Sequence, residues 1–366
     1  MFGSVYQNKK VLITGNTGFK GSWLTSWLLK LGANLIGISK DIPTTPSMFE
    51  TLGLSKKIDY YQEDLRNLSK INKIIASEKP DFIFHLAAQP IVSFSYEDPI
   101  ETISSNVMGT SNILESLKNI NHKCIAVIIT SDKAYENIEQ VWGYKENDPM
   151  GGKDPYSASK GAAELIIKSY FFSFFDKPQS NIRIGIGRAG NVIGGGDWAK
   201  DRIVVDCIQS WSENKAVEVR NPSATRPWQH VLEPISGYLS LGQNLFNSNL
   251  LHGEAFNFGP KADQNHTVKD LLIDLSRYWD FEDENHAFSL NEEKIFHEAG
   301  LLKLNCDKAN ALLNWQPCLD YKDNIRFTSE WYYDYHNTQV DMFNKTNDQL
   351  AQYELLAQSK GFEWTE

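Results

Sequence analysis

Residues 11–21 read Val-Leu-Ile-Thr-Gly-Asn-Thr-Gly-Phe-Lys-Gly, and this stretch decides the predicted fold. An apolar run with strand character leads into glycines spaced G-x-x-G-x-x-G, and apolar residues at helical spacing follow. At such a turn the backbone N–H groups that open the helix bind a pyrophosphate, and glycine lets the phosphate approach the backbone closely. A purely structural glycine turn is the alternative interpretation. The residues of this predicted phosphate loop are Gly15, Asn16, Thr17, Gly18, Phe19, Lys20 and Gly21.

The alternation of strand and helix continues through the first half of the chain. Because strands that are apolar throughout are buried on both faces, this pattern predicts a parallel sheet covered by helices, a Rossmann-type doubly wound α/β fold. Two of the helices are expected near residues 103–117 and 156–175. The short apolar runs, rich in Val and Ile, lie at residues 11–14, 35–39, 82–87, 125–130 and 182–186.

After about residue 189 the alternation breaks, which predicts a smaller, mixed α/β substrate domain. A chain of 366 residues is long enough for two domains. We expect the dinucleotide-binding domain at residues 1–189 and about 228–260. The second domain would take residues 190–227 and 261–366 and would end in a polar helix from Lys345.

Composition excludes several classes of protein. The chain has 36 basic and 46 acidic residues, a formal charge of −10, whereas a protein that follows nucleic-acid phosphates needs a basic face. No stretch approaches the length of a membrane span, and the first ten residues lack an apolar signal core. We therefore expect a cytoplasmic protein with no membrane contact. No metal site or disulfide is predicted from the widely spaced Cys124, Cys207, Cys306 and Cys318.

Two acids are candidates for binding the adenosine half of a dinucleotide. Asp41 follows the second predicted strand, where an acid bonds the ribose hydroxyls, and it favours NAD over NADP. Lys40 beside it could instead prefer a 2′-phosphate. Asp64 would contact the adenine if residues 60–63 form the third strand, with a solvated surface acid as the alternative.

Tyr156 and Lys160 form a Tyr-x-x-x-Lys pair on one predicted helix face. A free phenol, with a pKa of ~10, is a poor base at neutral pH. A neighbouring ammonium and a positively charged nicotinamide ring both favour the phenolate. Tyr156 could then accept a hydroxyl proton while a hydride leaves the same carbon.

Together these features resemble the extended short-chain dehydrogenase/reductase family, over nearly the whole chain. Further matching segments are 85–89, 106–110, 314–317 and 331–332. The resemblance implies NAD as cofactor, a nucleotide-sugar substrate, and a homodimer or higher oligomer that pairs the helices near 103–117 and 156–175. It adds Ser131 to the catalytic residues Tyr156 and Lys160, which also contact the cofactor. The other cofactor contacts that it implies are Leu65, Leu86, Ala87, Ala88, Gln89, Asn106 and Thr130.

The sequence Ser131-Asp132-Lys133 narrows the resemblance to the nucleotide-sugar 4,6-dehydratases. The lysine in its third position narrows the resemblance further, to the CDP-glucose 4,6-dehydratases. The departures are Asn16, where His is expected, and Ser131, where Thr is commoner. The match implies oxidation at C4, loss of water across C5 and C6, and return of the hydride to C6, in deoxysugar and surface-polysaccharide synthesis. Lys133 would be the base at C5, and Asp132 the acid at the departing hydroxyl; a salt bridge between them is the alternative. The longer matching strings are residues 17–24, 142–144, 154–160, 188–198 and 220–231.

The substrate diphosphate needs cationic groups in an otherwise acidic chain. Asn191 and Arg226 match family positions that hold it, and Gln89 is a further substrate contact. Arg202 and Arg220 are additional candidates, with surface ion pairs as the alternative. His85 and His230 are interpreted as structural. A 4-epimerase or reductase of the same fold, a dehydratase for another nucleotide hexose, and an inactive NAD-sensing regulator stay open; cytidine rests on the resemblance alone.

Overall fold

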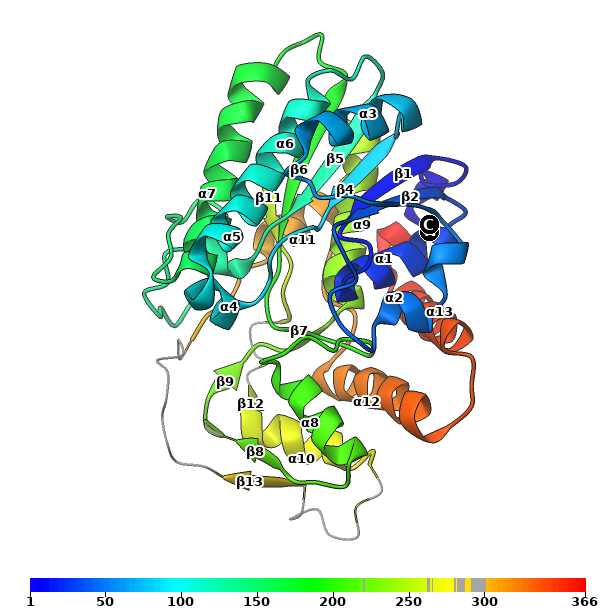
Figure 1. The fold of residues 1–366 in the computed structure, drawn as a ribbon, viewed down its shortest axis with the longest axis vertical. Coiled ribbons are helices and arrows are strands. Elements are labelled where there is room, and N and C mark those ends of the chain that lie inside the picture. The colour runs from blue at the N-terminus through cyan, green and yellow to red at the C-terminus, as the bar shows by residue number, and fades with distance from the viewer. Residues whose placement is uncertain (220, 262–263, 265, 280, 282–286, 291–300) are drawn as a thin grey trace.

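The computed structural model describes residues 1–219, 221–261, 264, 266–279, 281, 287–290 and 301–366. Within them, one seven-stranded parallel sheet has the strand order β11-β6-β5-β4-β1-β2-β3 (Figure 1). The predicted doubly wound sheet is confirmed, including the third strand. The strands are β1 Lys10–Thr14, β2 Asn34–Ser39, β3 Asp59–Gln62, β4 Phe82–His85, β5 Cys124–Ile129, β6 Ile182–Arg188 and β11 Ala255–Asn257.

Both faces of the sheet are buried, which explains why its strands are apolar throughout. Val11 and Ile13 of β1 face one core and Leu12 the other, because successive side chains of a strand point to opposite faces. The first core is covered by α1 Phe19–Lys30 and α9 Leu232–Asn247. The second core is covered by α3 Leu68–Glu78, α6 Gly109–Leu117 and α7 Pro155–Tyr170.

The two long helices predicted near 103–117 and 156–175 form with internal changes of pitch. The first consists of α5 Pro99–Ile103, a π-helical turn at Ser104–Met108, and α6. The second, α7, ends in a π-helical turn at Phe171–Phe175. Such turns reset which side chains share a helix face, and apolar periodicity alone does not reveal them.

Most elements after β6 form a second group below the carboxyl edge of the sheet (Figure 1), whereas β11, α9, α11 Asp307–Leu313 and α13 Met342–Ser359 return to the sheet and its helices. Three short strand pairs join its loops: β7 Val192–Ile193 with β10 Gln229–His230, β9 Thr225–Arg226 with β12 His266–Thr267, and β8 Val217–Val219 with β13 Phe288–Leu290. The remaining helices are α2 Met48–Thr51, α4 Val92–Glu97, α8 Ile203–Ser212, α10 Val268–Ser276 and α12 Tyr321–Asn337.

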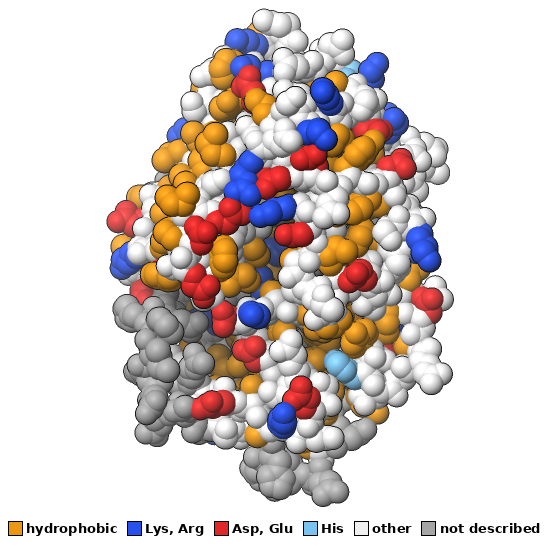
Figure 2. Space-filling model, in the orientation of Figure 1, with side chains coloured by type: hydrophobic (Ala, Val, Ile, Leu, Met, Phe, Trp, Pro, Cys, Tyr) orange, Lys and Arg blue, Asp and Glu red, His pale blue; other side chains and the backbone are white. Residues whose placement is uncertain are grey.

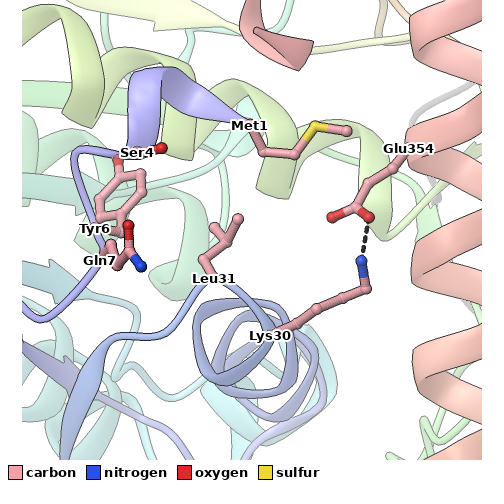
Figure 3. A pocket seen from close by; sticks show the side chains of 7 residues that line it. All are labelled: Met1, Ser4, Tyr6, Gln7, Lys30, Leu31 and Glu354. Carbon is pink, nitrogen blue, oxygen red and sulfur yellow. Dashed lines mark hydrogen bonds and ion pairs between the residues drawn. The ribbon is translucent and has the colours of Figure 1, made fainter.

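The C-terminal helix α13 packs against α1, the helix that follows the phosphate loop. Glu354 accepts a hydrogen bond from Trp27 Nε1 (2.8 Å) and pairs with Lys30 beside a small cavity of about 190 Å³ (Figure 3). Beyond α13, the Trp364 ring stacks on Phe2 with centroids 5.0 Å apart. The predicted domain boundaries stay a prediction, although α13 contacts the sheet's own helix and not only the second group.

Replacing Trp364 with Ala should lower the free energy of unfolding by about 3 kcal/mol, because the buried ring fills the space between Phe2, Trp27 and Tyr353. Denaturant unfolding of the purified protein measures this change. Leu355→Ala is the matched control, since Leu355 lies on α13 with 65% of its surface exposed and should change stability little. Equal effects of the two substitutions would contradict the packing described.

Candidate active site

A cavity of about 1570 Å³ opens at the carboxyl edge of the sheet, between the strand ends and the second group of elements. On the face of the molecule that Figure 2 shows, acidic and basic side chains are mixed across the middle. Of the predicted residues, Asn16 and Asn106 do not line the cavity, and Arg220 lies outside the described residues. Those that line it are Gly15, Thr17, Gly18, Phe19, Lys20, Gly21, Asp41, Asp64, Leu65, Leu86, Ala87, Ala88, Gln89, Thr130, Ser131, Asp132, Lys133, Tyr156, Lys160, Asn191, Arg202 and Arg226.

The phosphate loop has a shape that only glycine allows at two points. Gly15 has φ +73°, and a Cβ there would lie 2.7 Å from the backbone N of Ala87. A Cβ on Gly21 would lie 2.0 Å from the carbonyl oxygen of Gly15. Gly18 is the N-cap of α1, and no side chain in the described part of the chain caps this helix. The N–H groups of its first turn therefore face the cavity, as the binding of a dinucleotide pyrophosphate requires.

The side chain of Asn16, which is predicted from the sequence to contact the cofactor, does not line the cavity. Its side chain is buried under the loop, where it accepts a hydrogen bond from Ser39 Oγ (2.8 Å). Ser39 Oγ in turn accepts from Thr17 N (3.3 Å), and Thr17 Oγ1 donates to the Asp41 carbonyl (2.7 Å). Asn16 thus ties the loop to the end of β2. Glycine spacing does not reveal this role, because it depends on the neighbouring strand.

The two predicted adenosine-binding acids stand in different surroundings. Asp41 lines the cavity at the end of β2, and the ammonium of the adjacent Lys40 lies 3.1 Å from a carboxylate oxygen of Glu101. Asp64 is bound by Arg66 (2.6 Å), and this hydrogen bond lowers the pKa of Asp64. Asp64 therefore carries a structural ion pair as well as a place in the cavity wall.

Ser131, Tyr156 and Lys160 meet because α7 begins beside the end of β5. Asp154 caps α7 by accepting from Ser157 N (2.9 Å), and Pro155 opens its first turn. Tyr156 is hydrogen-bonded to the Ser131 side chain. Lys160, one helical turn on, has its Nζ 5.9 Å from the centre of the Tyr156 ring. This is the predicted arrangement of a phenol, a hydroxyl and an ammonium.

Burial dominates the protonation of this set. It raises the pKa of Tyr156 to about 12, although the hydrogen bond with Ser131 and the charge of Arg202 act to lower it. Burial lowers the pKa of Lys160 to about 8, opposed by the carboxylate of Glu164. The phenol is therefore protonated at neutral pH in the protein alone, and a bound cation is needed to favour its phenolate.

Asp132 and Lys133 follow Ser131 on a short 3-10 helix, Asp132–Ala134. The buried Asp132 carboxylate accepts from Ser131 Oγ (2.9 Å) and fills the space above Gly190, where a Cβ would lie 1.8 Å from Oδ2. Lys133 is half-buried at the cavity wall. Within the described residues these two side chains form no ion pair with each other, unlike the salt-bridge interpretation.

Lys20 has a larger place in the site than its position in the loop suggested. Burial lowers its pKa to about 8, and the charges of Arg202, Asp132 and Lys160 also act on it. Arg202 lies 3.1 Å from the carboxylate of Asp197, a cavity residue that the sequence reasoning missed. The ammonium of Lys20 therefore lies among the predicted catalytic and substrate-binding groups. The spacing of apolar residues in the sequence does not reveal these neighbours.

Asn106 acts behind the cavity wall. It lies on the π-helical turn, accepts from Gln89 N (2.7 Å), and donates to the Gln89 carbonyl (3.1 Å) and to Ser159 Oγ (2.8 Å). Its amide therefore joins the loop after β4 to α7, and it holds Gln89 in the wall. The Gln89 side chain itself bonds back onto its own loop and to Thr102.

The two histidines have structural surroundings. The His85 ring bridges Thr14 Oγ1 (2.7 Å) and Thr110 Oγ1 (3.0 Å), and burial lowers its pKa to about 3. His230 accepts from Leu232 N (3.3 Å) and is equally buried. Among the described residues, no group of three or more His, Cys, Asp or Glu side chains could hold a metal ion. None of the helices in those residues combines the length and apolar character that a bilayer crossing requires.

Known proteins of similar sequence and structure include several that act on nucleotide sugars. The chain is 46% identical to CDP-glucose 4,6-dehydratase of Salmonella typhimurium, over 89% of this chain and 91% of that protein. It is 26% identical to CDP-paratose 2-epimerase of Salmonella typhi, over 88% and 98%. Its fold matches that of dTDP-glucose 4,6-dehydratase from Streptomyces venezuelae, solved with NAD bound, with a TM-score of 0.74 and 19% identity over 89% of this chain and 97% of that one.

The family model described as GDP-mannose 4,6 dehydratase matches residues 12–328. This range runs from the phosphate loop through the catalytic segments and most of the second group of elements. Because model and relative both cover most of the length, the chain belongs to the GDP-mannose 4,6-dehydratase family.

Proposed function

We propose that this protein catalyses the NAD-dependent loss of water from CDP-glucose, which yields CDP-4-keto-6-deoxyglucose. The observation that carries the proposal is that Ser131-Asp132-Lys133 and the Tyr156/Lys160 pair line one cavity with the phosphate loop. The 46% identity to a CDP-glucose 4,6-dehydratase supports CDP-glucose over other nucleotide hexoses. A cytoplasmic location and a part in deoxysugar and surface-polysaccharide synthesis belong to the same proposal.

The cofactor would lie along the carboxyl edge of β1 and β2. The uncapped first turn of α1 would hold its pyrophosphate, and Asp41 its adenosine ribose. When bound, NAD would supply the redox chemistry, that is, reversible acceptance of a hydride from the sugar. Leu86, Ala87 and Ala88 after β4, with Thr130 after β5, would form the wall beside its reactive end.

Tyr156 starts the reaction as the base at C4. Its oxygen takes the proton of the C4 hydroxyl while the hydride leaves C4, and a 4-keto sugar results. Ser131, hydrogen-bonded to the Tyr156 phenol, orients the same hydroxyl. Lys160, one turn along α7, contributes the positive charge that favours the phenolate.

Asp132 and Lys133 carry out the elimination. The C4 ketone makes the C5 hydrogen acidic, so that Lys133, as a neutral amine, takes the C5 proton. Asp132, as a carboxylic acid, gives a proton to the C6 hydroxyl, which leaves as water. The hydride then goes to C6, and the Lys133 ammonium returns its proton to C5. Tyr156 has gained one proton and Asp132 has lost one, and exchange with solvent restores both.

The nucleotide diphosphate would be held by groups of the second part of the chain. Asn191 lies next to Gly190, and Arg226 belongs to β9; both line the cavity. Arg202 lines the same wall, with its guanidinium paired to Asp197. The fork of an arginine suits a diphosphate, because it can donate two parallel hydrogen bonds.

The proposal is tested by offering the purified protein CDP-, dTDP-, GDP- and UDP-glucose with NAD. CDP-glucose should lose one water, seen by mass spectrometry, with no net accumulation of NADH. A product of unchanged mass with inverted C4 would identify a 4-epimerase, and stoichiometric release of NADH would identify a simple dehydrogenase. Preference for another nucleotide would retain the dehydratase and correct its substrate.

Lys133→Ala should separate oxidation from elimination, since Lys133 is assigned the C5 proton and not the C4 hydride. In D₂O, deuterium incorporation at C5 should fall by at least about 100-fold, the usual contribution of a general base. Transient NADH absorbance after substrate addition should persist in this variant. If C5 exchange continued at the wild-type rate, Lys133 would not be the base.

We also propose that two copies of the chain associate through α5 and α7. These helices pack against each other and carry exposed apolar side chains. Figure 2 shows apolar side chains along the edge where Figure 1 places both helices. Several large apolar side chains exposed along one edge are typical of a protein interface. The most exposed apolar side chains on these helices and on the π-helical turns that follow them are Ile100, Met108, Leu165 and Phe172.

Leu165→Asp should convert the dimer to a monomer, because it places a charge on an apolar contact surface. Light scattering or sedimentation at several concentrations measures the dissociation constant, which should rise by at least about 10-fold. Leu355→Asp, at a similarly exposed position on α13, should leave association unchanged. An unaltered constant for the Leu165 variant would place any interface elsewhere.

A further inference from the structure

Behind the catalytic residues lies a buried ion pair that the proposed mechanism does not use. Arg188 Nε and Nη2 donate to the two carboxylate oxygens of Glu164, at 2.8 and 3.0 Å. Both side chains are 4% exposed. Taking two charges out of water is costly, and such a pair is often no more stabilising than apolar residues of the same volume. Its presence calls for an explanation other than stability.

The pair joins three segments that carry active-site residues. Thr130, the residue before Ser131, donates from Oγ1 to Glu164 Oε1 (2.5 Å). Arg188 ends β6, two residues before Gly190, on which the Asp132 carboxylate rests. Glu164 is in the middle of α7, one turn after Lys160. A shift of any segment would therefore break a hydrogen bond to one carboxylate.

The network continues to the segment after Lys133. Arg188 Nη1 donates to the Tyr135 hydroxyl (2.6 Å), which donates to Asn257 Oδ1 (2.7 Å) on β11. The charged and titratable groups facing Glu164 and Arg188 are thus Lys160 from α7 and Tyr135 from the loop after β5. Glu146 also faces Arg188: its backbone carbonyl accepts from Arg188 Nη1 (3.1 Å), and its carboxylate interacts with the Arg188 charge. The titratable groups around Lys160 are Glu164, Lys20, Tyr156 and the neutral His85.

We propose that Glu164 is a positioning residue that fixes α7 against the ends of β5 and β6 and keeps the Lys160 ammonium charged. A residue at i+4 on a helix is the nearest neighbour of residue i along the same face. The carboxylate opposes the loss of the Lys160 proton that burial favours. Arg188 holds this carboxylate in place through two hydrogen bonds. The catalytic consequence rests on the proposed function, whereas the effect on Lys160 does not.

The test is the titration of Lys160 in the protein without ligands. The ¹³Cε resonance of Lys160, in protein labelled at the lysine ε-carbon and assigned with Lys160→Arg, reports its pKa directly. The wild-type pKa is expected to be about 8. Glu164→Gln should lower it by about one unit, because an opposite charge is lost next to a buried amine. An unchanged Lys160 titration in a folded Glu164→Gln protein would falsify the proposal.

Glu164→Gln leaves Arg188 buried without its ionic partner, which could itself disturb the fold. A second variant that removes both charges controls for this effect. Glu164→Gln combined with Arg188→Met removes both charges and should still show the lowered pKa of Lys160. Recovery of the wild-type titration in the double variant would overturn the proposal, since the shift would then come from unpaired Arg188. Glu354→Gln is the control, because Glu354 is also a buried carboxylate paired with a basic side chain, here Lys30, but lies on α13 (Figure 3). It should leave Lys160 unchanged.

The catalytic readout is the pH profile with CDP-glucose. In both Glu164 variants the alkaline limb of kcat should move about one pH unit lower, with KM within about twofold, since the loss lies in a protonation state and not in binding. A parallel fall of kcat at every pH would overturn the proposal in favour of general loosening. Absence of turnover in the wild-type protein would refute the proposed function, and the titration would still decide the effect on Lys160.

Discussion

The site depends on one backbone contact, that of Gly21 with the carbonyl of Gly15. The start of α1 lies so close to the end of β1 that even a methyl group would come within 2.0 Å of this oxygen. This close approach directs the first turn of α1 toward the cavity. The close contact between the backbones of Gly15 and Ala87 places the end of β4 beside that turn. Because the other strands align with β1 and β4, the places of Ser131 and of α7 follow from the same geometry.

The fold could be predicted well because it follows from short-range patterns. Continuous Val and Ile runs identify strands buried on both faces, and the glycine spacing identifies the first crossover. The catalytic set could be predicted because Tyr156 and Lys160 share one helix face, and because Ser131-Asp132-Lys133 is contiguous. Prediction of the complete site also required the family resemblance, because the spacing of these residues in the sequence does not show that residues 131–133 lie near residue 156.

What the sequence did not reveal depends on neighbours distant along the chain. Asn16 belongs to a glycine motif, yet its side chain faces Ser39 of β2. Glu164 and Arg188 look like ordinary charges on a helix and a strand, and only the packing of the helix on the sheet brings them together. The pitch changes within the helices that contain Asn106 and Phe171 are equally invisible to periodicity. For Asn16, Asn106 and the Glu164–Arg188 pair, tertiary structure sets which partner the polar group meets.

The packing of α13 on α1 also bears on how the chain acquires its structure during synthesis. The face of α1 that carries Trp27 is completed by Glu354, Tyr353 and Trp364, more than 300 residues later. While the ribosome is still making the second half, the part of this face that the C-terminal segment covers is exposed, although Phe2 already packs on the Trp27 ring. The first crossover unit is therefore synthesised early, but its α1 face is fully buried only after the C-terminal segment has been synthesised. A chaperone that bound this face until then would protect the nascent chain from aggregation.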